Sequence, residues 1–269
     1  MSGLLLENKN AVIYGGGGAI GGAVARVFAR EGARVFIAGR TQAKLDAVAR
    51  DITAAGGKVE TALVDAADQE AVERHADAVA ATAGHIDVAL NAVGVMHVQG
   101  TPLADLSLEE FLRPIDGSLR TLFITSKAVA RHMGGERPGV ILNLSEPGAK
   151  LAVEGILGHG VSAAGKEAFS RVLAAELAPG NIRVLTIRPH AVVDSIAAGS
   201  YTKDVFAPSA EAAGQSIEEM LDDAMQHGTL LKRLPTLADV AETAAFLASD
   251  RAGAMTGTVV NLTGGALVD

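Results

Sequence analysis

Short apolar runs that alternate with helical segments constrain the fold of this chain more than any other feature. The runs occupy residues 10–14, 34–38, 58–64, 86–90, 139–144, 182–187 and 257–262. Between them, apolar residues recur at helical spacing, as at Val24, Val27 and Phe28. A repeated strand–helix–strand order produces parallel strands joined by crossover helices. The sequence therefore predicts an α/β fold, a doubly wound parallel sheet of seven strands with helices on both faces.

The predicted elements form one domain that spans residues 1–269. No linker or change of composition divides the chain, and its length fits a single α/β domain. Hydrophobic residues make up 49% of the sequence, which is enough for a sizeable core and too many for a disordered chain. Residues 190–235 form an irregular segment with helical character around 216–226.

Charge and composition exclude several classes of partner and site. The net charge is −8 and the pI is about 5.4. No basic stripe is visible, so we expect no nucleic acid or anionic membrane partner. The chain has no cysteine, which excludes disulfides and thiolate sites, and no His, Asp or Glu spacing indicates a metal site. The apolar run at residues 4–6 is too short for a signal peptide, and no run reaches the ~18 residues of a membrane span, so we expect a soluble cytoplasmic protein.

A glycine-rich turn joins the first predicted strand to the first predicted helix. Gly16, Gly18 and Gly21 fit the pattern G-x-G-x-x-G in this strand–turn–helix context. Glycine is needed because a side chain would keep the backbone away from a pyrophosphate, whose charge is held by backbone N–H groups and the positive helix end. The turn therefore predicts a dinucleotide site in a fold of the Rossmann type.

The end of the second predicted strand indicates which dinucleotide binds. An acidic residue at this point would bind the ribose 2′-hydroxyl of NAD. The sequence has Arg40 and Thr41 instead, and the planar guanidinium of arginine can bind a 2′-phosphate. We expect NADP(H) in preference to NAD(H).

Several segments resemble the short-chain dehydrogenase/reductase family over nearly the whole chain. The turn at 15–21 resembles the family's TGxxxGIG loop, with Tyr14 in place of Thr and Ala19 in place of the middle Gly. Residues 91–94 (NAVG) resemble its NNAG segment, and residues 182–189 and 239–265 resemble its IRVN…PG stretch and its tail. The resemblance implies cofactor contacts at Gly15, Gly17, Gly18, Ile20, Gly21, Arg40, Thr41, Asp65, Ala66, Asn91, Gly94, Lys166, Pro189 and Val192.

The family's active site usually contains Asn, Ser, Tyr and Lys, of which only the lysine is intact here. The pattern Y-x-x-x-K reads Ser162-Ala163-Ala164-Gly165-Lys166, and the asparagine position reads Ser118. Ser145 is the candidate for the family's serine, at a longer spacing from Ser162 than usual. A serine hydroxyl is far less acidic than a phenol of pKa ~10. The resemblance therefore implies Lys166, Ser145, Ser162 and Ser118 as catalytic candidates in an altered proton-transfer site.

Another group then has to supply the proton. His159 precedes Lys166 by seven residues, which is the Y-x6-K spacing of the family's enoyl-thioester reductase branch with His in place of Tyr. The 2,4-dienoyl-CoA reductase branch carries Ser-x-x-x-Lys but takes its donor tyrosine from upstream, where this chain has Leu151. His190 is a second histidine candidate, because imidazole titrates near pH 6.5.

The remaining ionisable residues are weaker candidates. Tyr14 belongs to the glycine turn and Tyr201 to the irregular segment, so neither is an obvious replacement for the family's tyrosine. Glu146 and Glu154 could act as carboxylate bases, but without a visible partner such residues are more often solvated.

Together these features predict an NADP(H)-dependent oxidoreductase that transfers hydride between nicotinamide and a carbonyl or conjugated enoyl substrate. The missing tyrosine favours an enoyl, because the proton can reach carbon later from water. Residues 190–235 match the family's substrate-covering segment, and their apolar residues can either line a pocket for an apolar small molecule or pack on the sheet. The losses of Tyr and Asn leave a second hypothesis open, a non-redox member that acts as a regulatory or scaffold protein or as an isomerase or lyase. By analogy with the family we expect a homotetramer or homodimer.

Overall fold

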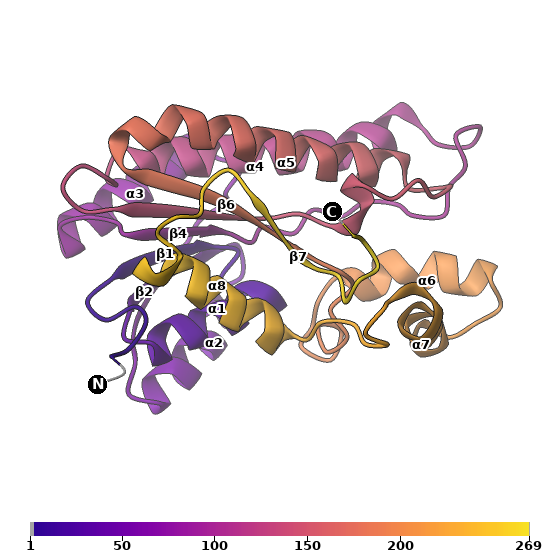
Figure 1. Cartoon of the computed structure of the whole chain (residues 1–269), viewed down its shortest axis with the longest axis horizontal. Coiled ribbons are helices and arrows are strands. Elements are labelled where there is room, and N and C mark those ends of the chain that lie inside the picture. The colour runs from indigo at the N-terminus through magenta and orange to yellow at the C-terminus, as the bar shows by residue number, and fades with distance from the viewer. Residues whose placement is uncertain (1–2, 269) are drawn as a thin grey trace.

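The computed structural model describes residues 3–268, which contain one seven-stranded parallel sheet (Figure 1). The strands are β1 (Asn10–Tyr14), β2 (Arg34–Gly39), β3 (Lys58–Leu63), β4 (Val88–Asn91), β5 (Gly139–Leu144), β6 (Ile182–Pro189) and β7 (Val259–Leu262). Their order is β3-β2-β1-β4-β5-β6-β7, and every neighbouring pair is parallel. The predicted α/β fold with a doubly wound sheet is confirmed.

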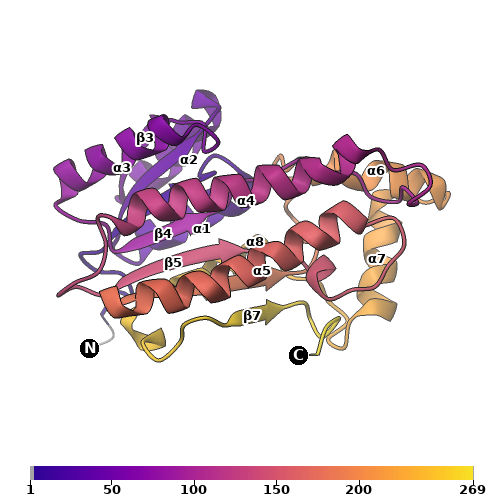
Figure 2. The same cartoon turned by 90° about the horizontal axis from the view of Figure 1, so that it is seen from above.

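Helices cover both faces of the sheet (Figures 1 and 2). They are α1 (Ala19–Arg30), α2 (Gln42–Ala54), α3 (Gln69–Ala83), α4 (Leu108–Ala130), α5 (Leu157–Leu177), α6 (Thr202–Ala212), α7 (Ile217–Gly228) and α8 (Leu237–Ala248). Helices α1, α2 and α8 pack on one face, and α3, α4 and α5 pack on the other. Strands contribute alternate residues to the two cores: Ala11 and Ile13 face α1, while Val12 and Tyr14 face the opposite layer.

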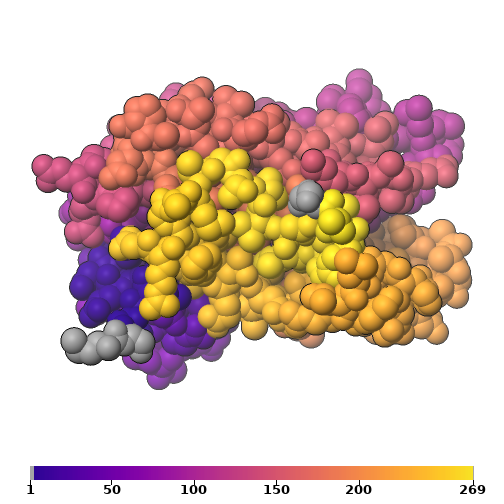
Figure 3. All heavy atoms as spheres, viewed as in Figure 1, coloured from indigo at the N-terminus to yellow at the C-terminus, as the bar shows by residue number. Residues whose placement is uncertain are grey.

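The strand order reverses between β1 and β4, which are neighbours in the sheet but not in the sequence. Chains leaving the two strands turn to opposite faces, so a crevice opens beyond their carboxyl ends. Helices α6 and α7 lie at this same end of the sheet (Figure 1). In the space-filling view, they form the orange mass beside the yellow carboxyl-terminal segments (Figure 3).

Some element boundaries differ from those predicted. The fourth strand begins at Val88 rather than at residue 86, because the Ile86 N–H donates to the His132 carbonyl outside the sheet. The last strand begins at Val259 rather than at residue 257, where Gly257 has a φ of +66° and leaves the extended conformation. Within residues 190–235, α7 matches the predicted helical stretch, whereas the sequence did not indicate α6.

Candidate active site

A cavity of about 890 Å³ lies at the carboxyl ends of the strands. It runs from the glycine turn after β1, past the ends of β4 and β5, to α5 and the segment that contains α6. Most of the predicted cofactor-contact residues line it: Gly15, Gly17, Gly18, Ile20, Arg40, Thr41, Asp65, Ala66, Asn91, Gly94, Lys166, Pro189 and Val192. Gly21 is absent from this lining.

The glycines of the first turn meet different steric requirements. Gly15 has a φ of +83°, and a Cβ there would lie 2.3 Å from the Ala92 carbonyl oxygen. A Cβ on Gly21 would lie 2.3 Å from the Gly15 carbonyl oxygen, so Gly21 lets α1 approach the turn closely. Gly18 caps α1 without a side-chain hydrogen bond, and the first turn of that helix has no acidic residue. This helix end suits the pyrophosphate of a dinucleotide.

The far end of the cavity is cationic. Arg40 and Lys44 line it from the end of β2 and the first turn of α2, and both side chains are exposed. Within residues 3–268, neither cation has a carboxylate partner in hydrogen-bond or ion-pair reach. The sequence analysis did not identify Lys44, the third residue of α2.

A chain of buried hydrogen bonds links the end of β4 to the helix that carries Lys166. Asn91 Nδ2 donates to Asn143 Oδ1 at 2.7 Å, and Asn143 Nδ2 donates to Ser170 Oγ at 2.9 Å. Ser170 Oγ in turn donates to the Lys166 carbonyl at 2.8 Å. Asn91 Oδ1 is buried without a hydrogen-bond partner in the described part of the chain, so it can accept a bond from a bound molecule. The donor and acceptor set of this crevice thus fits a nicotinamide dinucleotide.

Lys166 forms an ion pair inside the cavity. Its Nζ lies 2.6 Å from Glu146 Oε1 and 2.5 Å from Oε2. About a third of the Glu146 side chain is exposed, and Glu146 borders the cavity. Burial alone would raise the pKa of Glu146, but the Lys166 ammonium and two nearby histidines hold it below its usual value. The interpretation of Glu146 as a solvated carboxylate without a partner is therefore wrong, whereas Glu154 is exposed as expected.

The three candidate serines have different surroundings. Ser118 lines the cavity from α4. Ser145 is buried, and its hydroxyl donates to Glu167 Oε1 at 2.9 Å. Ser162 Oγ donates to the Pro114 carbonyl at 2.9 Å, in the contact between α4 and α5. Ser162 does not line the cavity, and the structure brings only Ser118 and Ser145 to its wall.

Two stacked histidines stand beside the ion pair. The rings of His97 and His159 are 4.4 Å apart between centroids and 11° from parallel. His97 Nδ1 donates to the Val95 carbonyl at 3.0 Å, so its Nε2 accepts from the Gln99 amide at 3.1 Å. His97 is therefore a neutral imidazole with a fixed tautomer, and the sequence analysis did not identify it.

His159 is the open member of the stacked pair. Seven residues make almost two helical turns, so His159 and Lys166 lie on the same face of α5. Among the described residues, no group forms a hydrogen bond with either ring nitrogen of His159. Burial lowers its pKa to about 4, so the ring is neutral near pH 7. His190 also lines the cavity, and burial lowers its pKa as well.

Tyr201 occupies the same cavity. A Cβ on Gly94 would lie 2.3 Å from Tyr201 Cε1 and 3.1 Å from Cζ, so the ring lies directly against Gly94. Tyr201 forms a backbone hydrogen bond with Val95, and burial, with the charge of Glu146, raises its pKa to about 12. The sequence analysis set this tyrosine aside because its segment is irregular, whereas the structure places it in the wall of the cavity. No local sequence pattern marks the contact between positions 94 and 201.

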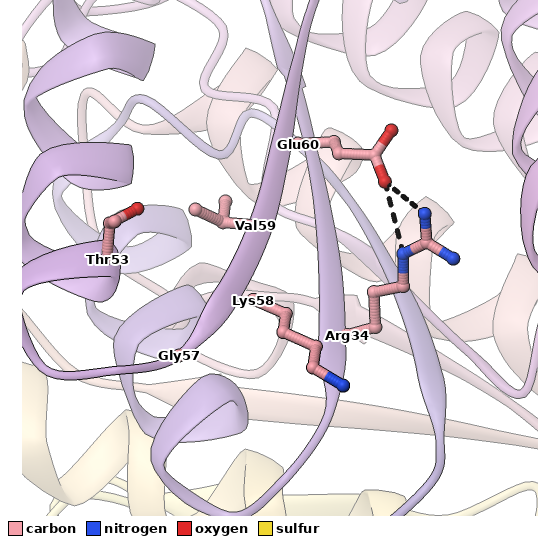
Figure 4. A pocket seen from close by; sticks show the side chains of 6 residues that line it. All are labelled: Arg34, Thr53, Gly57, Lys58, Val59 and Glu60. Carbon is pink, nitrogen blue, oxygen red and sulfur yellow. Dashed lines mark hydrogen bonds and ion pairs between the residues drawn. The ribbon is translucent and has the colours of Figure 1, made fainter.

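Other features of the described residues are less suited to catalysis. A smaller hollow at β3 is lined by six residues, among which Arg34 and Glu60 pair with each other at 2.5 Å (Figure 4). Within residues 3–268, no group of three or more His, Cys, Asp or Glu side chains is arranged to hold a metal ion. The helices described there are all too short or too polar to cross a membrane.

Comparisons with known proteins agree with this geometry. Residues 17–266 match the protein family described as enoyl-(acyl carrier protein) reductase. The chain is 30% identical to the 3-oxoacyl-[acyl-carrier-protein] reductase FabG of Chlamydia muridarum, over 97% of this chain and 98% of that one. It is 31% identical to the L-xylulose reductase of Bos taurus, over 98% of both chains.

Solved structures show the same fold. A short-chain dehydrogenase/reductase from Serratia marcescens is 25% identical and matches with a TM-score of 0.83, over 97% of this chain and 99% of that one. An NAD+-bound xylitol dehydrogenase with 24% identity matches in fold, with a TM-score of 0.87 over 97% and 99% of the two chains. Because the family match and these relatives span nearly the whole chain, the protein belongs to the short-chain dehydrogenase/reductase family and is an oxidoreductase of that type, with a nicotinamide cofactor and a small-molecule substrate.

Proposed function

We propose that this protein is an NADP(H)-dependent oxidoreductase that transfers hydride between nicotinamide and a carbonyl or conjugated enoyl group, with an altered proton-transfer site. The observation that carries the proposal is the Lys166–Glu146 ion pair, which borders the same cavity as the glycine turn. Ser162 holds the position of the family's tyrosine but donates to Pro114, so it supplies no acid to the cavity. The name of the matched family favours an enoyl substrate.

When bound, the reduced cofactor supplies hydride. Lys166 gives N–H bonds to Glu146, and its ammonium keeps further donor capacity for a ribose hydroxyl. The ion pair leaves the site with little net charge, which suits a neutral substrate. Ser118, Ser145, His159 and His190 are the other candidates that line the same cavity.

The cationic end of the cavity supports NADP(H) over NAD(H). A 2′-phosphate would gain charge-assisted bonds from Arg40 and Lys44, and no acidic side chain at the end of β2 would bind a free 2′-hydroxyl. A charge-assisted bond contributes about 1.5–3 kcal/mol, so Arg40→Ala should weaken NADPH binding about tenfold or more and leave NADH binding nearly unchanged. Nucleotide fluorescence titrations measure both, with Arg74→Ala on the exposed face of α3 as the control. Tighter binding of NADH than of NADPH to the unaltered protein would contradict the preference.

An apolar small molecule suits the substrate end. Residues from the loop before α5 and from residues 190–235, which we propose as the substrate-covering segment, line it with apolar side chains: Leu151, Val153, Ile156, Val205 and Phe206. These groups would bury the hydrocarbon part of a substrate next to the ion pair.

The activity is tested by NADPH oxidation with a panel of ketones, aldehydes and enoyl thioesters. We expect turnover with at least one class and a loss of at least a hundredfold in Lys166→Ala. Lys127→Ala, on the exposed side of α4, is the matched control and should retain the rate. Nucleotide binding without turnover across the panel would contradict the proposal and favour a non-redox role.

We also propose that the protein is a homodimer or homotetramer. Helices α4 and α5 lie side by side (Figure 2), and their outer faces expose apolar side chains: Leu108, Leu112, Phe123, Val161 and Val172. Exposed apolar side chains on two neighbouring helices favour association. Size-exclusion chromatography with light scattering would show a monomer if this is wrong.

A further inference from the structure

We propose that Tyr201, carried by the covering segment rather than by α5, donates the proton to the substrate oxygen. The inference deepens the reduction proposed above and rests on it. As hydride from the reduced nicotinamide forms the new C–H bond, the π electrons of C=O move to oxygen. The Tyr201 O–H bond then breaks and an O–H bond forms on the substrate, after which water reprotonates the phenolate. For an enoyl substrate, the same proton transfer gives the enol, which returns to the carbonyl form in water.

The position of the Tyr201 ring supports its assignment as the proton donor. Tyr201 immediately precedes α6, and its ring lies against Gly94, just beyond the end of β4. Any side chain at position 94 would overlap the ring, since even a Cβ would lie 2.3 Å from Cε1. The glycine thus provides the space in which a phenol from a distant segment reaches the cavity.

The surroundings of the Tyr201 hydroxyl also support this assignment. Tyr201, Glu146 and Lys166 line one cavity, and the Glu146 charge acts on the phenol. Burial and this charge keep Tyr201 protonated at neutral pH, so it retains a proton to give. Glu146 is ionised by its pairing with Lys166 and has no proton to donate.

The alternatives among the lining groups are weaker acids near pH 7. His159 and His190 are mainly neutral, because burial lowers their pKa values. A neutral imidazole and the Ser118 hydroxyl both give up a proton much less readily than a phenol. Tyr201 is therefore a better neutral acid than Ser118, His159 or His190.

Activity and binding are measured together on the unaltered protein, Tyr201→Phe and Lys203→Ala. Lys203 is the control: it lies two residues further on, in the first turn of α6, and its side chain is exposed. We expect Tyr201→Phe to lower kcat by about 10²–10⁴-fold, with NADPH affinity changed less than threefold and Lys203→Ala retaining the rate. An unchanged kcat in Tyr201→Phe, or a raised one that marks the ring as a plug, would overturn the assignment. So would a loss of turnover in His159→Asn with none in Tyr201→Phe.

A second measurement needs neither cofactor nor turnover. The chain has two tyrosines and no tryptophan, so ultraviolet absorbance in the Tyr14→Phe background follows the ionisation of Tyr201 alone. We expect its midpoint well above pH 10, and a lower midpoint when Glu146→Gln removes the neighbouring charge. An ordinary midpoint that Glu146→Gln does not move would show that the phenol does not face Glu146, and would overturn the proposal.

The measurements distinguish a failure of the proposed function from a failure of the Tyr201 assignment. If the unaltered protein binds NADPH but reduces nothing, the proposed function fails, and the role of Tyr201 fails with it. If the unaltered protein is active and Tyr201→Phe is equally active, the function stands and only the assignment of Tyr201 is wrong.

Discussion

At the scale of single residues, Gly15 is one of the positions where the backbone has no room for a side chain. Its φ of +83° is unfavourable for other residues, and a Cβ would overlap the Ala92 carbonyl oxygen. We expect Gly15→Ala to lower the free energy of unfolding by about 2 kcal/mol or more, measured by urea denaturation without nucleotide. Gly180→Ala is the control, because its Cβ would have no atom closer than 4.0 Å and its φ is not positive; we expect a change within about 0.5 kcal/mol. Equal losses in the two variants would refute the steric argument.

The buried pair of Arg188 and Glu167 supports the wall of the active site. Arg188 donates to the two carboxylate oxygens of Glu167 at 2.7 and 2.9 Å, and Ser145 also donates to that carboxylate. Removal of the arginine would leave a buried charge with one hydroxyl partner. We expect Arg188→Ala to cost about 3–5 kcal/mol of unfolding free energy.

The exposed pair Arg120–Asp116 provides the comparison for this buried one. Its nitrogen–oxygen distance is similar, at 2.8 Å, but both side chains are more than half exposed. Arg120→Ala should therefore lower the free energy of unfolding far less than Arg188→Ala does. If both arginine variants lose the same stability in urea, burial does not distinguish the two pairs.

At the scale of elements, the parts predictable from sequence are those with a local cause. The strands of the sheet centre are continuous apolar runs, and the capping box of α4 forms between Ser107 and Glu110, which are only three residues apart. Helix α6 contains Pro208 and buries only Val205 and Ala210 fully, so its sequence has no strong apolar stripe. Contacts with the rest of the cavity wall, rather than periodicity, determine its place.

Helix α7 should open more readily than the helices that cover the sheet. It has no fully buried residue, and its amino-terminal end is held by a capping box between Ser216 and Glu219. Loss of the cap costs about 1 kcal/mol, so Ser216→Ala should speed amide exchange in α7 about fivefold without moving the global urea midpoint. Ser107→Ala removes the same cap from α4, whose interior amides should keep their protection because that helix is anchored by buried residues. Unchanged exchange in α7 would show that its cap does not limit opening.

At the scale of the whole molecule, the candidate site also contains residues that the local sequence predicts and residues that only the fold brings together. The glycine turn, Arg40 and Lys166 are predictable because short motifs define them. Glu146 and Tyr201 are not, because their importance arises from contacts with Lys166 and Gly94, which are distant in sequence. A resemblance can indicate that Ser162 stands where a tyrosine is expected, but only the fold brings another phenol into the cavity.

Stability of the whole molecule should fall in mild acid because of its buried histidines. Burial lowers the pKa of His75 to about 4, whereas the unfolded chain has the ordinary value of ~6.5. Above pH 6.5 both states are neutral and the fold keeps the full contribution of this group. As the pH falls from 6.5 towards 4, the unfolded chain binds the proton first, and stability is lost.

Between pH 7.5 and pH 4.8, His75 alone should account for a loss of about 2 kcal/mol at most. Urea midpoints at the two pH values, compared between the unaltered protein and His75→Asn, measure this share. The variant should show a smaller decrease, since asparagine does not titrate. His227→Asn is the control, because that side chain is 78% exposed beside Asp223, and it should leave the decrease unchanged. A decrease in His75→Asn equal to that of the unaltered protein would mean that protonation of this histidine does not oppose folding.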